Sequence, residues 1–143
     1  MRFLVDTPVL SELVRKVPDP GVVNWVKRTS PEQLYVSVVT FGELTKGIAK
    51  LPDGQRKGLL LSWVETELKD WFGDRILEVD LEVAERWGLL LAKAERKGRP
   101  LPAVDALLAA TALVHGLVLV TRNTRHFEAA GLEILNPWSD AQH

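Results

Sequence analysis

Hydrophobic positions along the chain fall into two kinds of run that alternate with each other. Short runs rich in Val, Ile and Leu predict β-strands at residues 2–5, 34–38, 76–79, 117–120 and 133–135. The longer segments between them place apolar residues three or four positions apart, which is typical of amphipathic helices. The clearest stripes are Leu10, Leu13, Val14 and Val17, then Leu60, Val64, Leu68 and Phe72, then Ala84, Trp87, Leu91 and Ala94.

The ends of the predicted helices carry residues that favour helix termini. Asp19-Pro20 supplies an N-cap followed by proline at the first helical position, and Gly73, Gly98 and Gly116 stand where C-terminal glycines belong. Strands separated by helices imply crossover connections. We therefore expect an α/β fold, a three-layer α/β/α sandwich with a central, mainly parallel five-stranded sheet, formed by a single domain over residues 1–143.

Composition and charge limit the possible functions. The chain has 143 residues, a net charge of −1 and no cysteine, which excludes disulfides, zinc ribbons, iron–sulfur clusters and thiol catalysis. A cytoplasmic setting without a membrane partner is expected, because the N-terminal apolar stretch is too short for a signal peptide. The apolar stretch 101–120 is interrupted by Asp105, His115 and Gly116, which favours a buried helix and strand over a membrane span.

Polar side chains stand at the ends of the predicted strands. Asp6 closes the first strand, Glu43 lies one turn after the second, Asp105 falls in the first turn of a helix, and Asn123 follows the fourth strand. Ligand sites of parallel sheets form beyond the carboxyl ends of the strands, so these residues are expected at one edge of the sheet. Three carboxylates there repel one another unless a cation joins them, and an all-oxygen site suits Mg²⁺ or Mn²⁺.

Each of these residues also has a purely structural interpretation. Asp6 can cap its helix, and Thr40-x-x-Glu43 matches a capping box. Asp105 can stand at the positive end of a helix dipole, and Asn123 is a good N-cap or turn residue. Taken one at a time, these residues do not show whether they have only these structural roles or form a shared site.

Four segments in order, and a closing tripeptide, resemble the PIN domain, in particular the VapC- and FitB-type toxins of prokaryotic toxin–antitoxin pairs. They are Leu4-Val5-Asp6-Thr7-Pro8-Val9-Leu10-Ser11-Glu12-Leu13, Val39-Thr40-Phe41-Gly42-Glu43-Leu44-Thr45-Lys46-Gly47-Ile48, Pro102-Ala103-Val104-Asp105-Ala106-Leu107-Leu108-Ala109-Ala110-Thr111-Ala112, Val120-Thr121-Arg122-Asn123 and Asn136-Pro137-Trp138.

The resemblance implies a metal-dependent endoribonuclease. Asp6, Glu43 and Asp105 would bind Mg²⁺ or Mn²⁺ and support hydrolysis of RNA phosphodiester bonds, leaving a 5′-phosphate and a 3′-hydroxyl. Thr121 and Asn123 would help to position metal or water. The family also implies a homodimer and a cognate antitoxin protein, with DNA bound only indirectly, through the antitoxin.

The chain departs from the more acidic versions of this family. Asn123 stands where an Asp can occur, and His126-Phe127 stands where an acid can precede Phe. An amide offers a carbonyl oxygen but no charge, which leaves the number of ions open. The alternative function is therefore a catalytically impaired PIN-like module that binds RNA or an antitoxin without cleavage, and a third is a nuclease directed at DNA.

Cations near the predicted site are candidates for binding the substrate. Lys46, Arg122 and Arg125 can hold RNA phosphates, although each can equally be a solvated surface charge. Because the net charge is close to zero, RNA contacts are expected only from such local patches or from bound cations. His126 is expected to be a surface or loop residue.

Overall fold

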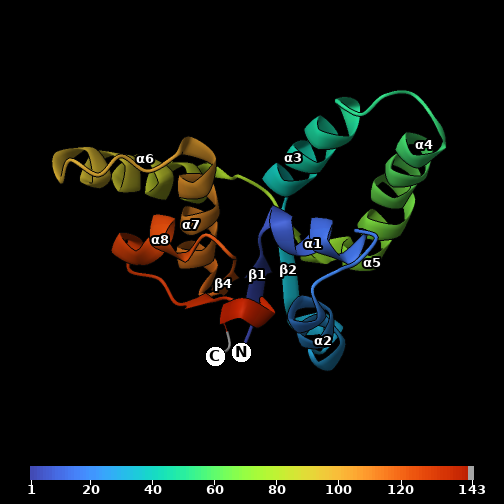
Figure 1. Ribbon diagram of the computed structural model, residues 1–143. Coiled ribbons are helices and arrows are strands. Elements are labelled where there is room, and N and C mark those ends of the chain that lie inside the picture. Colours follow the sequence, from blue (N-terminus) through green and yellow to red (C-terminus); the bar gives the residue numbers. More distant parts are fainter. Residues whose placement is uncertain (142–143) are drawn as a thin grey trace.

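A five-stranded parallel sheet forms the centre of the computed structural model, which describes residues 1–141. Residues 142 and 143, the end of the single domain expected from the sequence, lie outside this part. The strands are β1 (Phe3–Val5), β2 (Leu34–Ser37), β3 (Ile76–Leu77), β4 (Val118–Val120) and β5 (Ile134–Leu135), in the order β3-β2-β1-β4-β5. All four strand pairs are parallel. The expected α/β/α architecture is confirmed (Figure 1).

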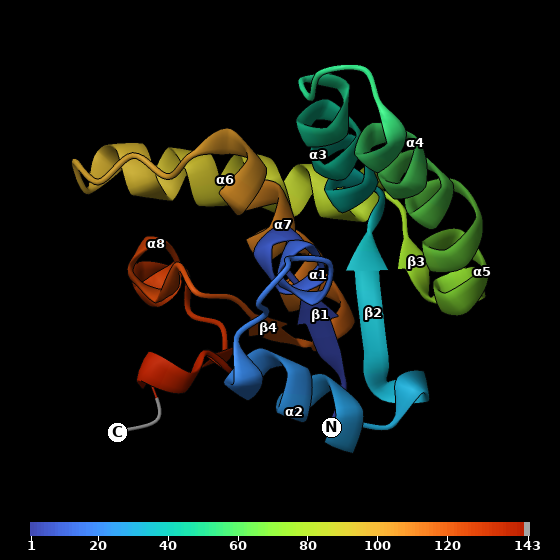
Figure 2. The ribbon, with the colours of Figure 1, turned by 45° about the vertical axis from the view of Figure 1, so that its right-hand side comes forward.

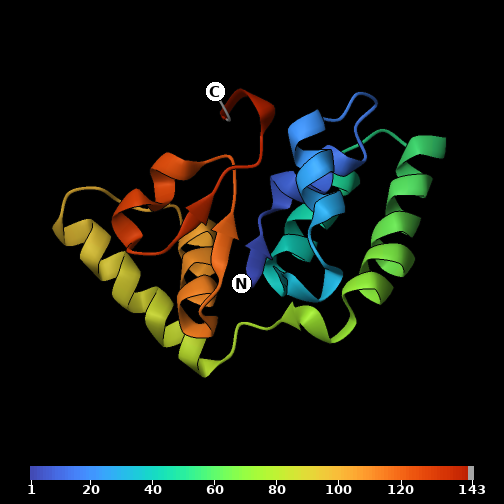
Figure 3. The same ribbon diagram turned by 90° about the horizontal axis from the view of Figure 1, so that it is seen from below.

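Helices lie on both faces of this sheet (Figures 2 and 3). They are α1 (Thr7–Leu13), α2 (Pro20–Arg28), α3 (Val38–Ala49), α4 (Gln55–Ser62), α5 (Lys69–Phe72), α6 (Leu81–Arg96), α7 (Ala103–His115) and α8 (Thr124–Phe127). A π-helical segment, η2 (Trp63–Leu68), joins α4 to α5. Short 3₁₀ turns are η1 (Pro31–Gln33), η3 (Gly73–Arg75), η4 (Glu128–Ala130) and η5 (Ser139–Ala141).

The alternation of side chains along the strands divides the core into two clusters. Val5 of β1 and Val120 of β4 belong to the cluster on the face covered by α1, α2 and α3. Leu4 and Leu119, which point the other way, pack with Leu108 of α7 on the opposite face. Successive strand side chains alternate between faces, so a three-residue strand contributes to both clusters. Such strands, buried on both faces, read as continuous apolar runs.

The strands are shorter than the sequence pattern predicts. The predicted strand 34–38 ends at Ser37, because Val38 already begins α3 and the Ser37 hydroxyl accepts a hydrogen bond from the Val39 amide at 3.0 Å. The predicted strand 76–79 ends at Leu77, since only Ile76 and Leu77 have partners on β2. The strands predicted at 2–5, 117–120 and 133–135 each begin one residue later. Apolar runs continue past the last paired residue, so pattern alone places the strand ends too far out.

The predicted helix ends are confirmed. Asp19 caps α2 by accepting a hydrogen bond from the Val22 amide at 3.2 Å. Gly73 and Gly116 are the C-caps of α5 and α7, with φ of +54° and +66°, a backbone conformation that favours glycine. The apolar stretch 101–120 contains α7 and β4, as expected. Within residues 1–141, no helix combines the length and the apolar character needed to cross a membrane.

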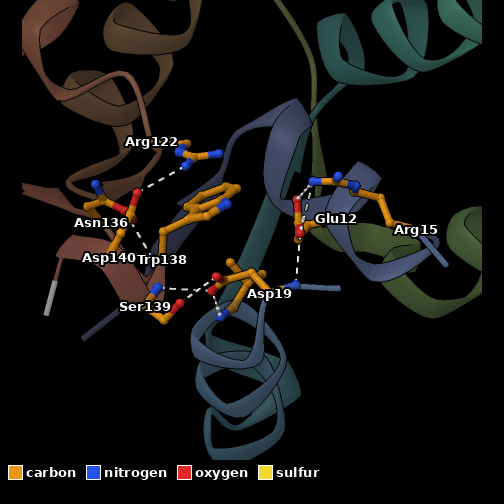
Figure 4. A network of polar contacts seen from close by, with 9 residues as sticks. Glu12, Arg15, Asp19, Arg122, Asn136, Trp138, Ser139 and Asp140 are labelled. Atoms are coloured by element: carbon orange, nitrogen blue, oxygen red, sulfur yellow. Dashed lines mark hydrogen bonds and ion pairs between the residues drawn. The ribbon is translucent and has the colours of Figure 1, made fainter. Parts of the chain in front are cut away.

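The C-terminal segment is fastened to the start of α2 (Figure 4). The Asp19 carboxylate accepts hydrogen bonds from the Ser139 amide at 2.9 Å and from the Ser139 hydroxyl at 2.5 Å. The Ser139 hydroxyl bond is the main reason why the pKa of Asp19 lies below its usual value. Trp138 is buried beside this contact, with 3% of its surface exposed. The segment therefore closes one end of the core.

Replacing Gly21 with alanine should weaken this attachment. A Cβ at Gly21 would lie 2.5 Å from the Pro137 carbonyl oxygen and 2.6 Å from the Ser139 amide nitrogen, both of them backbone atoms. We expect Gly21→Ala to lower the free energy of unfolding by about 1–3 kcal/mol in urea denaturation. The control is Gly58→Ala in α4, where a Cβ meets nothing and a gain of about 0.5–1 kcal/mol is expected. If both substitutions changed the free energy of unfolding equally, the close packing of Gly21 against the C-terminal segment would be contradicted.

Candidate active site

Asp6 lies at the centre of the candidate site, between the ends of two adjacent strands. It follows β1, and its Oδ1 accepts a hydrogen bond from the Thr7 amide at 2.8 Å as the N-cap of α1. Its Oδ2 accepts a hydrogen bond from the Thr121 hydroxyl, which follows β4, at 2.7 Å. Asp6 is 4% exposed and Thr121 is fully buried. The capping interpretation is correct, but one carboxylate oxygen makes a second contact across the sheet.

Glu43 reaches the same region from the second turn of α3. Its Oε1 accepts a hydrogen bond from the Thr7 hydroxyl at 2.5 Å, and its side chain is half-buried. The capping-box interpretation of Thr40 and Glu43 is wrong. A helix capped by Thr40 would begin at residue 41, but α3 begins at Val38 and its N-cap is Ser37. Thr7 thus contacts two acids, one through its amide and one through its hydroxyl.

Asp105 comes from the first turn of α7 and is paired with a histidine. Its Oδ2 lies 2.6 Å from Nδ1 of His126 in α8. The Asp105 side chain is 18% exposed and the His126 side chain 50% exposed. The expectation for His126 captured its exposure but missed this contact. No sequence pattern marks it, because the two residues are 21 positions apart on separate helices.

The three acids interact electrostatically. The pKa of Asp6 is raised above its ordinary value, chiefly because burial disfavours the ionised form. Hydrogen bonds from Thr121 and Thr7 oppose this effect, whereas the negative charges of Glu43 and Asp105 add to it. A cation beside Asp6 would relieve both the burial cost and the repulsion.

The donor chemistry fits a hard divalent cation. The three acids offer carboxylate oxygens, the ligands that Mg²⁺ and Mn²⁺ prefer. Among residues 1–141, however, no three His, Cys, Asp or Glu side chains lie together closely enough to form a ready-made metal site. Glu43 and Asp105 are turned instead toward Thr7 and His126. Each of these contacts uses one carboxylate oxygen, Oε1 of Glu43 or Oδ2 of Asp105. An ion held by all three acids would therefore take the other oxygen of each, once the side chains draw closer to Asp6.

Thr121 and Asn123 differ in how they relate to this cluster. The Thr121 hydroxyl, besides donating to Asp6, accepts a hydrogen bond from the Asn123 amide at 3.1 Å. The Asn123 side chain is exposed and makes no hydrogen bond with any part of the chain that the structure describes. Asn123 is the N-cap residue of α8, as the structural interpretation expected, but its side chain makes no capping hydrogen bond.

The three candidate cations have different surroundings. Lys46 is exposed one turn after Glu43 and lines a shallow depression between α3 and α7. Arg125 lines a cavity together with His126. Arg122, by contrast, is paired with Asp140 at 3.1 Å, and its guanidinium lies 5.5 Å from the centre of the Trp138 ring (Figure 4). Lys46 and Arg125 thus flank the acids, whereas Arg122 is turned toward the C-terminal segment.

Comparisons with known proteins agree with this arrangement. The PIN domain family matches residues 3–132. VapC ribonuclease Y4jK of Sinorhizobium fredii is 38% identical over 97% of this chain and 99% of its own. Toxin FitB of Neisseria gonorrhoeae is 37% identical over 96% and 99%. A chain of the FitAcB crystal structure from Neisseria gonorrhoeae is 36% identical and superposes with a TM-score of 0.91, covering 96% of this chain and 99% of that one.

Neutralising Asp6 should stabilise the protein when no metal is present. Because its pKa is raised in the folded state, the favourable contribution of Asp6 is complete below the unfolded value of 3.8 and is lost as the pH rises through the folded pKa. In EDTA at neutral pH we expect Asp6→Asn to melt above the wild type, with the difference vanishing in acid. Asp80→Asn, at the exposed cap of α6, is the matched control. A wild type that is more stable than Asp6→Asn at neutral pH would contradict the raised pKa of Asp6.

Proposed function

Because the chain belongs to the PIN domain family, we propose that it is a divalent-metal-dependent endoribonuclease and the toxin of a VapBC/FitAB-like toxin–antitoxin pair. The observation that carries the proposal is the buried Asp6, which accepts hydrogen bonds from Thr121 and from the Thr7 amide while the Thr7 hydroxyl binds Glu43. Burial chiefly raises the pKa of Asp6, and the nearby charges of Glu43 and Asp105 add to this effect. Relatives named VapC ribonuclease and Toxin FitB, each aligned over almost the whole chain, support the reaction and the biological role.

In this proposal Asp6, Glu43 and Asp105 hold Mg²⁺ or Mn²⁺. When bound, such an ion activates water for attack on phosphorus and stabilises the departing oxygen. Thr121 fixes one oxygen of Asp6, and the Thr7 hydroxyl holds Glu43 within reach of the ion. The donors are neutral hydroxyls, so they orient the two acids without cancelling the negative charge that attracts the cation.

The remaining residues act on the substrate side. The exposed Asn123 follows β4 next to the Thr121 that holds Asp6, and its carbonyl oxygen, which has no hydrogen-bond partner within residues 1–141, can help to position metal or water. Lys46 and Arg125 bind backbone phosphates on either side of the acids. Arg122 joins them only by exchanging Asp140 for a phosphate, and an exposed pair of this kind contributes no more than about 1 kcal/mol.

The proposed setting follows from the same family. Residues 1–143 form a single PIN domain that works in the cytoplasm as a homodimer, and a cognate antitoxin protein restrains it. DNA is bound only through that antitoxin. Chains similar to this one occur in a FitAB structure bound to an IR36 DNA fragment, at 35% identity and a TM-score of 0.90 over 95% of both chains, which supports this assembly.

Cleavage of RNA should depend on the three acids and on the metal. We expect purified protein to cut a structured RNA with Mg²⁺ or Mn²⁺ but not with EDTA, leaving 5′-phosphate and 3′-hydroxyl ends. Asp6→Asn, Glu43→Gln and Asp105→Asn should each lower kcat by about 100-fold or more, since each removes one charged ligand. Asp80→Asn, which changes an exposed acid at a helix cap, should cleave normally.

The same assay separates the alternatives. RNA that stays intact under every condition would favour a PIN-like module that binds RNA or an antitoxin without cleavage. Metal-independent cleavage that leaves cyclic phosphates would contradict both accounts, because it uses the RNA 2′-hydroxyl instead of an activated water. A matched single-stranded DNA, cut faster than the RNA, would identify a nuclease directed at DNA.

Removing His126 should affect metal binding. Its ring nitrogen lies 2.6 Å from Asp105, so it fixes the direction of that carboxylate. Residues that orient a metal ligand contribute about 10- to 100-fold to metal affinity. We expect His126→Ala to weaken Mn²⁺ binding by that factor in a calorimetric titration, while His115→Ala, at the opposite end of α7 from Asp105, leaves it unchanged. Equal Mn²⁺ affinity in the two variants would show that the contact with Asp105 plays no part in metal binding.

A further inference from the structure

The cavity lined by Arg125 and His126 lies beside the candidate active site, because His126 also contacts Asp105. It has a volume of about 200 Å³ and is enclosed by α6, the connection at residues 97–102 and the α8–η4 segment. Its lining includes Leu90, Ala94, Lys97, Arg99, Arg125 and His126. We call it the basic cavity.

The path of the chain after α6 creates the basic cavity. The connection turns at Gly98, whose φ is +69°, and runs back along α6 before α7 begins (Figure 2). Two hydrogen bonds hold it there, from the Arg99 amide to the Ala94 carbonyl and from Trp87 Nε1 to the Ala103 carbonyl, both at 3.0 Å. These hydrogen bonds fix one wall of the cavity, and α8 forms another.

The charge of the basic cavity is strongly one-sided. Four exposed cations line it, Lys93, Lys97, Arg99 and Arg125, against a single acid, Glu128. None of these cations has an ion-pair or side-chain hydrogen-bond partner in the described part of the chain. A protein whose net charge is −1 gathers unpaired cations here. Such a local patch attracts an anion. It does not stabilise the fold, because neighbouring like charges repel one another.

The floor of the basic cavity is apolar. The lining residues Leu90, Ala94, Leu101 and Ala130 are half-buried, whereas the lining cations are exposed, so the apolar side chains form the floor and the cations form the rim. An apolar floor under a cationic rim suits a nucleotide, because the flat base can lie on the floor while the phosphates meet the rim. His126 lines the cavity and also contacts Asp105. A nucleotide bound in the cavity would therefore be separated from the acids only by this histidine.

We propose that the basic cavity binds a nucleotide of single-stranded RNA adjacent to the phosphodiester that is cleaved. The inference rests on the proposed function, to which it adds a substrate-binding site outside the carboxylate cluster. An acidic peptide would also match the charged rim, but the apolar floor and the continuity with Asp105 favour a nucleotide.

The test measures binding of a fluorescein-labelled oligouridylate by anisotropy in EDTA, where cleavage is blocked. We expect the double variant Lys97→Gln/Arg99→Gln to bind about tenfold more weakly, and the slope of log K against log salt to fall by about 0.7 for each phosphate that the variant no longer neutralises. The control, Lys27→Gln/Arg28→Gln, removes the same charge from the exposed last turn of α2 and should leave both quantities unchanged.

A second variant tests the floor without altering charge. Ala94→Phe should weaken binding of the same oligouridylate while leaving the salt slope as in the wild type, because it fills the space for the base and leaves the cations of the rim in place. Thermal melting establishes that the variant is folded. If Ala94→Phe and Lys97→Gln/Arg99→Gln both bind RNA like the wild type, the proposal is wrong.

The outcomes for the basic cavity and for the proposed function remain distinguishable. A wild type that cleaves RNA, with cavity variants that bind normally, overturns the cavity proposal alone. A wild type that never cleaves, with cavity variants that bind RNA more weakly, overturns the catalytic function and the position beside a cleaved bond, but supports nucleotide binding in the basic cavity. Unchanged RNA affinity together with weakened binding to an oligoglutamate peptide would assign the cavity to an acidic protein partner and overturn the proposal.

Discussion

The burial of an ionisable carboxylate between β1 and β4 is the constraint on which the rest of the site depends. Asp6 is 4% exposed, and an unpartnered carboxylate at such a position would be very costly. The Thr7 amide and the Thr121 hydroxyl each satisfy one of its oxygens. The Thr7 amide is next to Asp6 in the chain, whereas Thr121 is within reach only because β4 pairs beside β1 in parallel, so that the residues following the two strands meet. The sheet order is therefore a requirement of the chemistry as well as of the core.

The hydroxyl groups around the cluster explain how three acids coexist near one another. The Thr7 hydroxyl binds Glu43 and the Thr121 hydroxyl binds Asp6, so both acids are oriented by groups that carry no charge. An Arg or Lys in these places would pair with the acids and remove the potential that attracts a divalent ion. Asp105 alone has a partner that can become charged, His126, which lies toward solvent. Within residues 1–141, Asp6 and Glu43 thus have no cationic side chain paired with them.

The sequence predicts this site well where connectivity determines position. Parallel strands followed by helices bring their carboxyl ends to one edge, which is why Asp6, Glu43 and Asp105 could be expected together. The sequence predicts the N-cap of a helix poorly where two suitable residues lie close together. Ser37 and Thr40 both carry hydroxyls, and only the end of β2 shows that Ser37 caps α3. Contacts between separate helices, such as Asp105 with His126, leave no local pattern and cannot be read from spacing.

The distribution of charge resolves the conflict between an acidic site and a polyanionic substrate. RNA is repelled by three carboxylates, and the net charge of −1 offers no general attraction. The cations lie instead on two flanks, Lys46 and Lys50 along α3 and the rim of the basic cavity beyond His126. Phosphates held on both flanks would draw the strand across the acids, where the proposed divalent ion would supply the positive charge that this part of the surface lacks. Because the cations lie apart from the acids, the carboxylates would remain free to bind that ion.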